Sequence, residues 1–179
     1  VLYITDQIDG LVIFDVSDPS NPQNLGVLEV DGLPEDISVS PDGTKIYLAN
    51  STGGLKIINV ENPASPSLLA TFDTGGSAYG VNVSNNDEFA YVAGSNGIAM
   101  IDVRVPASPV LVSGLQTSET AYSIDTSADN SFGVIAEGSS GITLVDFAKK
   151  VLSSGEDIPQ TVTFENKSEV SMPEGYLGI

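Results

Sequence analysis

A motif that returns at near-constant spacing constrains the fold of this chain more than any other feature. Each copy begins around a glycine, continues as an apolar run and reaches an Asp or Asn. The copies are DGLVIFDVSDPSNP at 9–22, GGLKIINVENPASP at 53–66, NGIAMIDVRVPASP at 96–109 and a shortened SGITLVDFAKK at 140–150. Their glycines lie 44, 43 and 44 residues apart. Such a period indicates a repeat architecture in which neighbouring units complete one another's core.

Each repeat is predicted to hold four short β-strands. EDISVS, YGVNVS and YSIDTS alternate apolar and polar residues, as a half-buried strand does. A turn rich in Asn, Asp and Gly leads to KIYLAN, FAYVAG or FGVIAE, and a further turn leads to the apolar run of the motif. Prolines then end that strand before a fourth, such as NLGVLEV. The third strand should be central and buried, including Ile13, Ile57, Ile101 and Leu144.

Four antiparallel strands in about 43 residues are typical of a β-propeller blade. We therefore predict an all-β propeller built of four-stranded antiparallel blades. A helical solenoid does not fit strands with a period of two. The repeats extend over about 1–45, 46–89, 90–132 and 133–179, the last of them degenerate.

The motif also resembles a known family. GLVIFDVSDPSNP and YVAGSNGIAMIDV are similar to the LVIVD repeats of bacterial and archaeal β-propellers, and SPDGTKIYLANS is similar to the YVTN-type repeats of surface-layer propellers. The resemblance covers roughly residues 1–147. It implies an extracellular or cell-surface propeller and no particular enzyme activity. The fourth copy departs from the pattern because DFAKKVLSSG lacks both prolines.

The C-terminal segment permits two interpretations. Residues 159–168 can be aligned with the first strand of a blade at 34–43, and 176–179 with the second strand at 47–50. In one interpretation the chain is part of a propeller of roughly six to eight blades. In the other, the C-terminal strand joins the N-terminal strands and closes a four-bladed ring.

Composition limits the kind of partner and of chemistry. Asp and Glu number 24 against 6 Lys and Arg, for a formal net charge of −18. This charge repels nucleic acids and anionic membranes, and no segment is apolar enough to insert in a membrane. The chain has no His, no Cys and a single arginine, Arg104. Zinc-type or haem-type sites and a histidine base are therefore excluded.

Recurring polar residues have mainly structural interpretations. Asp or Asn recurs at the end of each third strand, where it can hydrogen-bond the following turn. These residues are Asp15, Asn59, Asp102 and Asp146. We predict no metal site and no cofactor. Ca²⁺ is the one alternative, because Asp and Asn gather in the turns at 40–44, 84–88 and 127–131 and Ca²⁺ takes oxygen ligands.

The entry to each first strand is the candidate binding site. Ligands of propellers commonly bind where these entries converge over the central channel. The residues there differ between blades, as contact residues would, and Tyr offers a large side chain with a polar tip. The candidates are Glu35, Asp36, Tyr79, Asn82, Tyr122 and Asp125.

We therefore expect a non-catalytic, secreted or cell-surface module that contacts a protein or a carbohydrate and has no catalytic residues. Two alternatives stay open. One is a hydrolase or lyase of the propeller type that uses carboxylates and Ca²⁺, with residues from blades outside this chain. The other is a structural subunit of an extracellular polymer that self-assembles through open blade edges.

Overall fold

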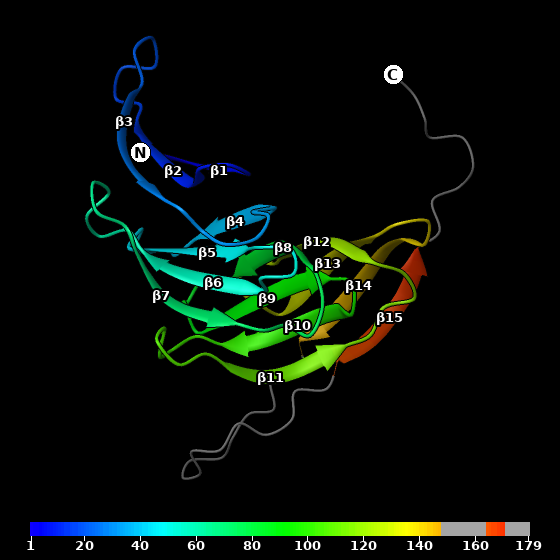
Figure 1. Ribbon diagram of the computed structural model, residues 1–179. Helices are drawn as coiled ribbons and strands as arrows, with labels where there is room; N and C mark the ends of the chain where they lie inside the picture. The colour runs from blue at the N-terminus through cyan, green and yellow to red at the C-terminus, as the bar shows by residue number, and fades with distance from the viewer. Residues whose placement is uncertain (148–163, 171–179) are drawn as a thin grey trace.

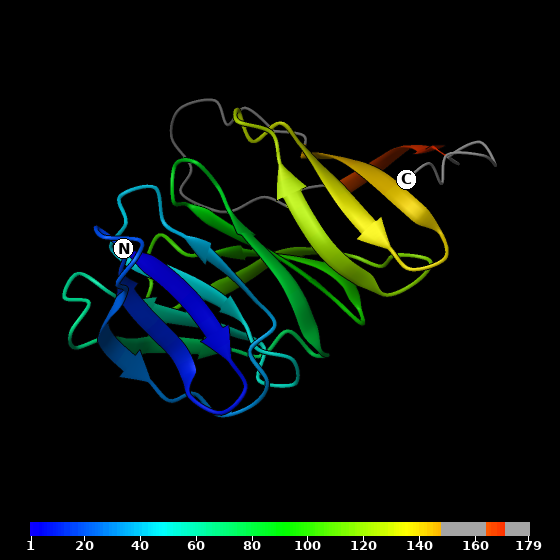
Figure 2. The same cartoon turned by 90° about the horizontal axis from the view of Figure 1, so that it is seen from above.

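The computed structural model describes residues 1–147 and the strand at 164–170. These residues form 15 β-strands in four antiparallel sheets, which follow one another in chain order (Figures 1 and 2). Among them is no helix of the length and apolar character that a membrane span needs. The all-β propeller prediction is confirmed: the sheets are antiparallel blades of the expected period.

The first sheet has three strands in the described part of the chain, and each later sheet has four. Each sheet is a meander in which sequential strands pair. The first comprises β1 (Leu2–Asp6), β2 (Gly10–Asp15) and β3 (Gln23–Leu28). The second comprises β4 (Asp36–Val39), β5 (Lys45–Ala49), β6 (Leu55–Asn59) and β7 (Ser67–Phe72). The third comprises β8 (Ala78–Val83), β9 (Phe89–Gly94), β10 (Gly97–Asp102) and β11 (Val110–Leu115). The fourth comprises β12 (Ala121–Thr126), β13 (Phe132–Glu137), β14 (Gly141–Phe147) and β15 (Phe164–Val170).

One serine organises the turn between the first and second strand of a blade. In the second blade, Ser40 Oγ accepts a hydrogen bond from Lys45 N at 2.9 Å and donates one to Asp42 Oδ1 at 2.6 Å. Ser127 Oγ makes the same contacts with Phe132 N and Asp129 Oδ1 in the fourth blade. The carboxylates of Asp42 and Asp129 thus bind donors within their own turns.

The polar residue that ends each third strand also caps a turn. Asp15 Oδ1 accepts a hydrogen bond from Ser17 N at 2.8 Å, and Asn59 Oδ1 accepts one from Glu61 N at 3.0 Å. Asp102 Oδ1 accepts one from Arg104 N at 3.0 Å. The Arg104 side chain also donates to this carboxylate, and that hydrogen bond is the main cause of the lowered pKa of Asp102. The structural interpretation of these three residues is confirmed, and that of Asp146 stays a prediction.

The core lies between consecutive sheets. We call the side of a sheet that packs on the next sheet its front face, and the side that packs on the preceding sheet its rear face. Three buried apolar clusters fill the three contacts. Ile13, Ile57 and Ile101 are fully buried, as predicted. Leu144 is only half-buried, so that part of the prediction is wrong, because no described sheet follows the fourth one.

The C-terminal strand differs from its sequence alignment. Residues 164–168 were expected in the first strand of a further blade. They belong instead to β15, which pairs with β14 as the outer strand of the fourth sheet, with Phe147 opposite Phe164. This part of the chain therefore does not close a four-bladed ring with β1, and the proposed strand at 176–179 lies outside the described residues.

Candidate functional site

The four blades are arranged in an arc (Figure 1). The first strands of the second, third and fourth blades lie side by side at its inner edge. They are β4, β8 and β12 (Figure 1). All six predicted binding residues lie on these strands or directly before them, so the structure brings them together along one edge. Their individual environments differ, however, and divide them into residues that join blades and residues that face solvent.

Three of the six join neighbouring blades. Asp36 Oδ2 accepts a hydrogen bond from Val81 N at 3.0 Å. Asn82 Nδ2 donates one to Asp125 Oδ1 at 3.1 Å, and Asn82 Oδ1 accepts one from Thr126 Oγ1 at 2.8 Å. These bonds link strands more than 40 residues apart in sequence. Asp36, Asn82 and Asp125 therefore act first as structural links between inner strands, a role that the sequence did not reveal.

Tyr79 and Tyr122 form an aromatic pair at the starts of β8 and β12. Their ring centroids are 5.5 Å apart and the planes are tilted by 33°. Tyr122 is 55% exposed, and Tyr79 is half-buried. A pair at this distance is favourable beyond the area that it buries. The two rings therefore form one apolar surface, with two hydroxyl groups, that reaches solvent.

A β-bulge positions each tyrosine. The pairing of β8 with β9 shifts between Ala78 and Gly80, so Tyr79 is the extra residue. The pairing of β12 with β13 shifts in the same way between Ala121 and Ser123, around Tyr122. Bulges bend a strand and redirect a side chain, and they are frequent beside functional sites. Two equivalent bulges thus place two tyrosines at the same position of adjacent blades.

A small residue allows the tyrosines to approach. A Cβ atom at Gly80 would lie 2.8 Å from the carbonyl oxygen of Tyr122, so the inner strands could not approach as closely with a larger residue. A Cβ atom at Gly138 would lie 3.7 Å from the Tyr122 ring, which is an ordinary van der Waals contact, so the ring does not require a glycine there. The exposed Glu35 occupies the equivalent position in the second blade. We refer to Glu35, Tyr79 and Tyr122 as the entry cluster.

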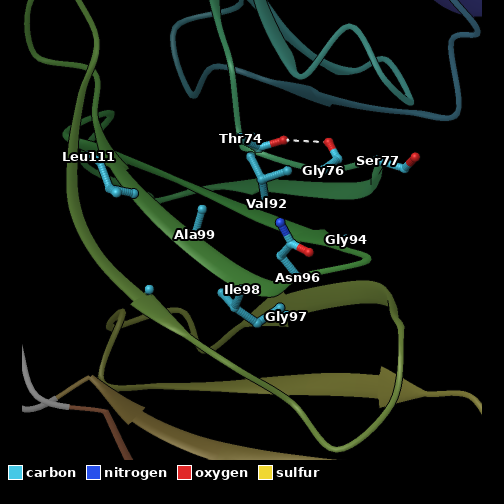
Figure 3. Close-up of a pocket in the computed structure, with 11 residues that line it drawn as sticks. Thr74, Gly76, Ser77, Val92, Gly94, Asn96, Gly97, Ile98, Ala99 and Leu111 are labelled. Atoms are coloured by element: carbon cyan, nitrogen blue, oxygen red, sulfur yellow. Dashed lines mark hydrogen bonds between the residues drawn. The ribbon is translucent and has the colours of Figure 1, made fainter.

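A small pocket lies in the third blade (Figure 3). Its volume is about 120 Å³, and its walls are the loop at 74–77 and residues of β9, β10 and β11. Thr74 Oγ1 donates a hydrogen bond to the carbonyl oxygen of Gly76 at 3.0 Å across its rim. Pockets for drug-sized ligands are typically about 300–1,000 Å³. This pocket is too small for such a ligand.

A second polar group lies at the opposite end of the blades. Tyr47 Oη donates a hydrogen bond to Asp87 Oδ1 at 2.8 Å, and Lys45 Nζ lies 2.9 Å from Asp87 Oδ2. Burial, together with Asp87, raises the pKa of Tyr47 above its usual range. Burial alone would lower the pKa of Lys45, but its contacts with Asp87 and Asp42 raise it. Each charge has a partner, so the group joins the second and third blades.

Described residues 1–147 and 164–170 hold no group of three or more acids that could bind a metal ion. The entry cluster has one carboxylate and two phenol groups.

The repeats identify the family. The LVIVD repeat model matches residues 2–28, 31–74 and 75–117. This chain belongs to the LVIVD-repeat family. The resemblance inferred from the motifs is thereby confirmed, and in this LVIVD-repeat protein the matches cover the first three blades. None of the curated proteins matches the chain.

Solved structures show the same fold. A Bacteroides uniformis protein named "putative 6-phosphogluconolactonase" is 18% identical, with a TM-score of 0.75 over 93% of this chain and 50% of that one. A Lactobacillus plantarum protein gives the same identity and TM-score over 93% and 51%. The β-propeller domain of Myceliophteria thermophila Cps50 (Swd1) is 14% identical, with a TM-score of 0.65 over 79% and 49%. The chain thus spans about half the length of these proteins, and identities this low establish the fold alone.

Proposed function

We propose that this LVIVD-repeat protein is a non-catalytic, secreted or cell-surface module that contacts a protein or carbohydrate through its entry cluster. The observation that carries the proposal is the paired, bulge-positioned Tyr79 and Tyr122, whose rings are 5.5 Å apart and reach solvent. Tyr122 is 55% exposed. An exposed aromatic pair is a typical contact surface because its large area is held rigidly.

The chemistry of the cluster favours particular partners. Aromatic faces pack against the C–H groups of a sugar ring or against cationic side chains, and Glu35 adds a negative charge nearby. The net charge of −18 favours basic partners and opposes nucleic acid. The absence of His and Cys and the single arginine support a non-catalytic role without a cofactor, since a histidine base, a cysteine nucleophile and an arginine cluster are all missing.

Binding to a glycan array and to a panel of Lys/Arg-rich peptides tests the proposal. The Tyr79→Ala/Tyr122→Ala variant should lose at least about tenfold in affinity for any ligand that the wild type binds, as expected for a hot spot. Leu68→Ala/Val110→Ala is the matched control, because it removes two exposed apolar side chains from the outer strands β7 and β11. Circular dichroism should be unchanged for both variants.

Equal affinity of wild type and the tyrosine variant for every ligand would contradict the role of the entry cluster. Hydrolysis of a lactone, glycoside or phosphoester by the purified wild type would contradict the non-catalytic role. A purified preparation of Tyr79→Ala/Tyr122→Ala is a useful control there, because contaminating activity would persist in it.

A further inference from the structure

The rear face of the third blade contains a pocket at a place that the second blade fills. This is the pocket of Figure 3, lined by Val92 and Ala99, which belong to the apolar packing between the second and third blades. Ala99 is nevertheless only half-buried, and Leu111, which also lines the pocket, is 53% exposed. The pocket therefore opens part of this contact between blades to solvent.

Three small residues account for the pocket. In the third blade, strand pairing places Ala99 between Val92 and Gly114. The second blade has larger residues at the three corresponding positions, which are Lys56 for Ala99, Leu48 for Val92 and Thr71 for Gly114. Lys56 is 7% exposed, so its apolar stem is buried at the position that stays open beside Ala99. The pocket is thus a difference between two blades of otherwise matching pattern.

The rim of the pocket is fixed in advance. The loop before β8 forms one side of it and is hydrogen-bonded to the turn between β9 and β10. Ser95 N donates to the carbonyl oxygen of Ser77 at 2.9 Å, and Asn96 Nδ2 donates to the carbonyl oxygen of Gly75 at 2.7 Å. Gly94 permits this approach, because a Cβ atom there would collide with the carbonyl oxygen of Ser77. A site that is already ordered costs less free energy to occupy.

The lining selects an aliphatic group. Val92, Ala99 and Leu111 supply apolar walls, and Thr74 and Ser77 lie together on one side (Figure 3). The volume of about 120 Å³ suits one side chain of leucine size, since an apolar cavity of roughly 150 Å³ in another protein binds benzene. None of the described residues that line the pocket is charged. A lysine entering from solvent would therefore bring its ammonium group among apolar walls without a partner, which is costly.

We propose that this pocket anchors one aliphatic side chain of leucine size from a protein partner. Burial of such a side chain removes apolar surface of both molecules from water. The polar groups of the rim are available to the partner's backbone. No residue of the entry cluster lines the pocket, so this site does not depend on the function proposed above.

An NMR titration of the isotope-labelled chain with N-acetyl-leucine methylamide tests the proposal. The amide signals of Gly94, Gly97 and Ala99 should shift, with a dissociation constant on the order of 10 mM, as for one buried side chain. N-acetyl-alanine methylamide and N-acetyl-lysine methylamide should bind at least about fivefold more weakly. Ala99→Lys/Gly114→Thr introduces the residues of the second blade and should abolish the shifts. Val110→Ala is the matched control, because it changes β11 outside the pocket.

The filled variant is expected to fold. A Cβ atom at Gly114 would lie 3.5 Å from the carbonyl oxygen of Ile98, an ordinary contact. Thermal melts check the fold, and Gly114→Thr alone is the second variant should the double one unfold. It should weaken binding of the leucine compound at least about threefold, because it narrows the pocket.

Three results would overturn the proposal. The first is the absence of shifts at these amides with the leucine compound. The second is equal affinity for the alanine or lysine compound, which would exclude an aliphatic side chain as the occupant. The third is unchanged binding by the filled variants, which would place the compound elsewhere. Tyr79→Ala/Tyr122→Ala should bind the leucine compound as the wild type does, so failure of this site and failure of the entry cluster can be distinguished.

Discussion

Single polar residues join neighbouring blades at both ends of the molecule. Asp87 has a left-handed backbone conformation, with φ of 57°, in a turn of the third blade, and its carboxylate binds Tyr47 and Lys45 of the second blade. At the inner edge, Asp36 of the second blade binds a backbone amide of the third. Such buried or half-buried hydrogen bonds fix how one blade is oriented on the next, because an unpaired group there would be costly.

Removing the Tyr47 hydroxyl should destabilise the protein. Tyr47→Phe removes the hydroxyl group that donates a hydrogen bond to Asp87 Oδ1 at 2.8 Å. We expect the free energy of unfolding to fall by about 1–2 kcal/mol. Urea unfolding measures it. Tyr91→Phe is the matched control, since Tyr91 is buried at the same position of the third blade and its hydroxyl has no hydrogen bond in the described residues. Equal losses for the two variants would contradict the proposed link.

The hydrogen bonds of Asp129 predict that the folded protein becomes less stable in acid. Hydrogen bonds from Ser127 and Ser131 lower the pKa of Asp129 from 3.8 to about 2. Because the pKa of the folded state is the lower one, this stabilisation is fully present above about pH 4–5 and is lost as the pH falls toward 2. Asp129→Asn keeps the acceptor oxygen, so its free energy of unfolding should fall less steeply over this window. Urea unfolding at several pH values measures the difference.

Asp9→Asn is the control for this titration, because Asp9 is an exposed turn residue whose carboxylate accepts no hydrogen bond in the described residues. If the free energy of unfolding of Asp129→Asn fell with pH as steeply as that of the wild type, the Asp129 turn would contribute nothing to the loss of stability in acid.

The third strand is the element on which each blade depends. β6 and β10 are covered on both faces, so their side chains enter both adjoining cores. The glycine that opens such a strand is also required by the geometry: Gly54 has φ of 68°, and a Cβ atom there would collide with the carbonyl oxygen of Phe72. Pro66, which follows the third strand of the second blade, is only half-buried, so it packs less closely than the fully buried Ile57.

This difference predicts unequal costs for two substitutions. Ile57→Ala should lower the free energy of unfolding by about 2–5 kcal/mol, because it leaves a cavity in a fully buried position. Pro66→Ala should cost only about 0.5–1 kcal/mol, through the greater freedom of the unfolded chain. Thermal melts of both variants provide the measurement. A proline variant less stable than the isoleucine variant would show that the connection has a tertiary role.

The whole molecule carries a large excess of one charge. Its 24 acidic residues repel one another in low salt, and the 6 basic residues offset only part of this repulsion. Self-repulsion of this kind opposes the compact state. The repeats, each stabilised by nearest neighbours, must overcome it through their apolar contacts.

Salt should therefore stabilise the fold. Raising NaCl from about 10 mM to about 0.5 M shortens the Debye length from roughly 30 Å to less than 10 Å, and we expect the melting temperature to rise by several degrees. Differential scanning calorimetry measures it. CaCl₂ at equal ionic strength is the control: a markedly larger rise with Ca²⁺ would indicate a specific calcium site. A melting temperature that falls or stays constant in NaCl would contradict the role of charge repulsion.

The sequence by itself determined the repeat, the four strands of each blade, the turns and the buried positions Ile13, Ile57 and Ile101. These features depend on local chemistry: alternation along a strand, turn-forming Asn, Asp and Gly, and the exclusion of proline from a central ladder. The sequence also placed Tyr79 and Tyr122 at equivalent positions, because the period alone aligns them.

Only the tertiary structure decided what each face meets. Leu144 has the same pattern as Ile57 but lies half-exposed, because alternation tells which side chains share a face and not whether another sheet covers it. The same limit concealed the links made by Asp36 and Asn82, whose partners lie in the next blade. The bulges at Tyr79 and Tyr122 depend on how adjacent strands pair. The position of residues 164–168 beside β14 depends on strand pairing in the same way. Long-range pairing and coverage follow from the packing of whole blades, which no local pattern specifies.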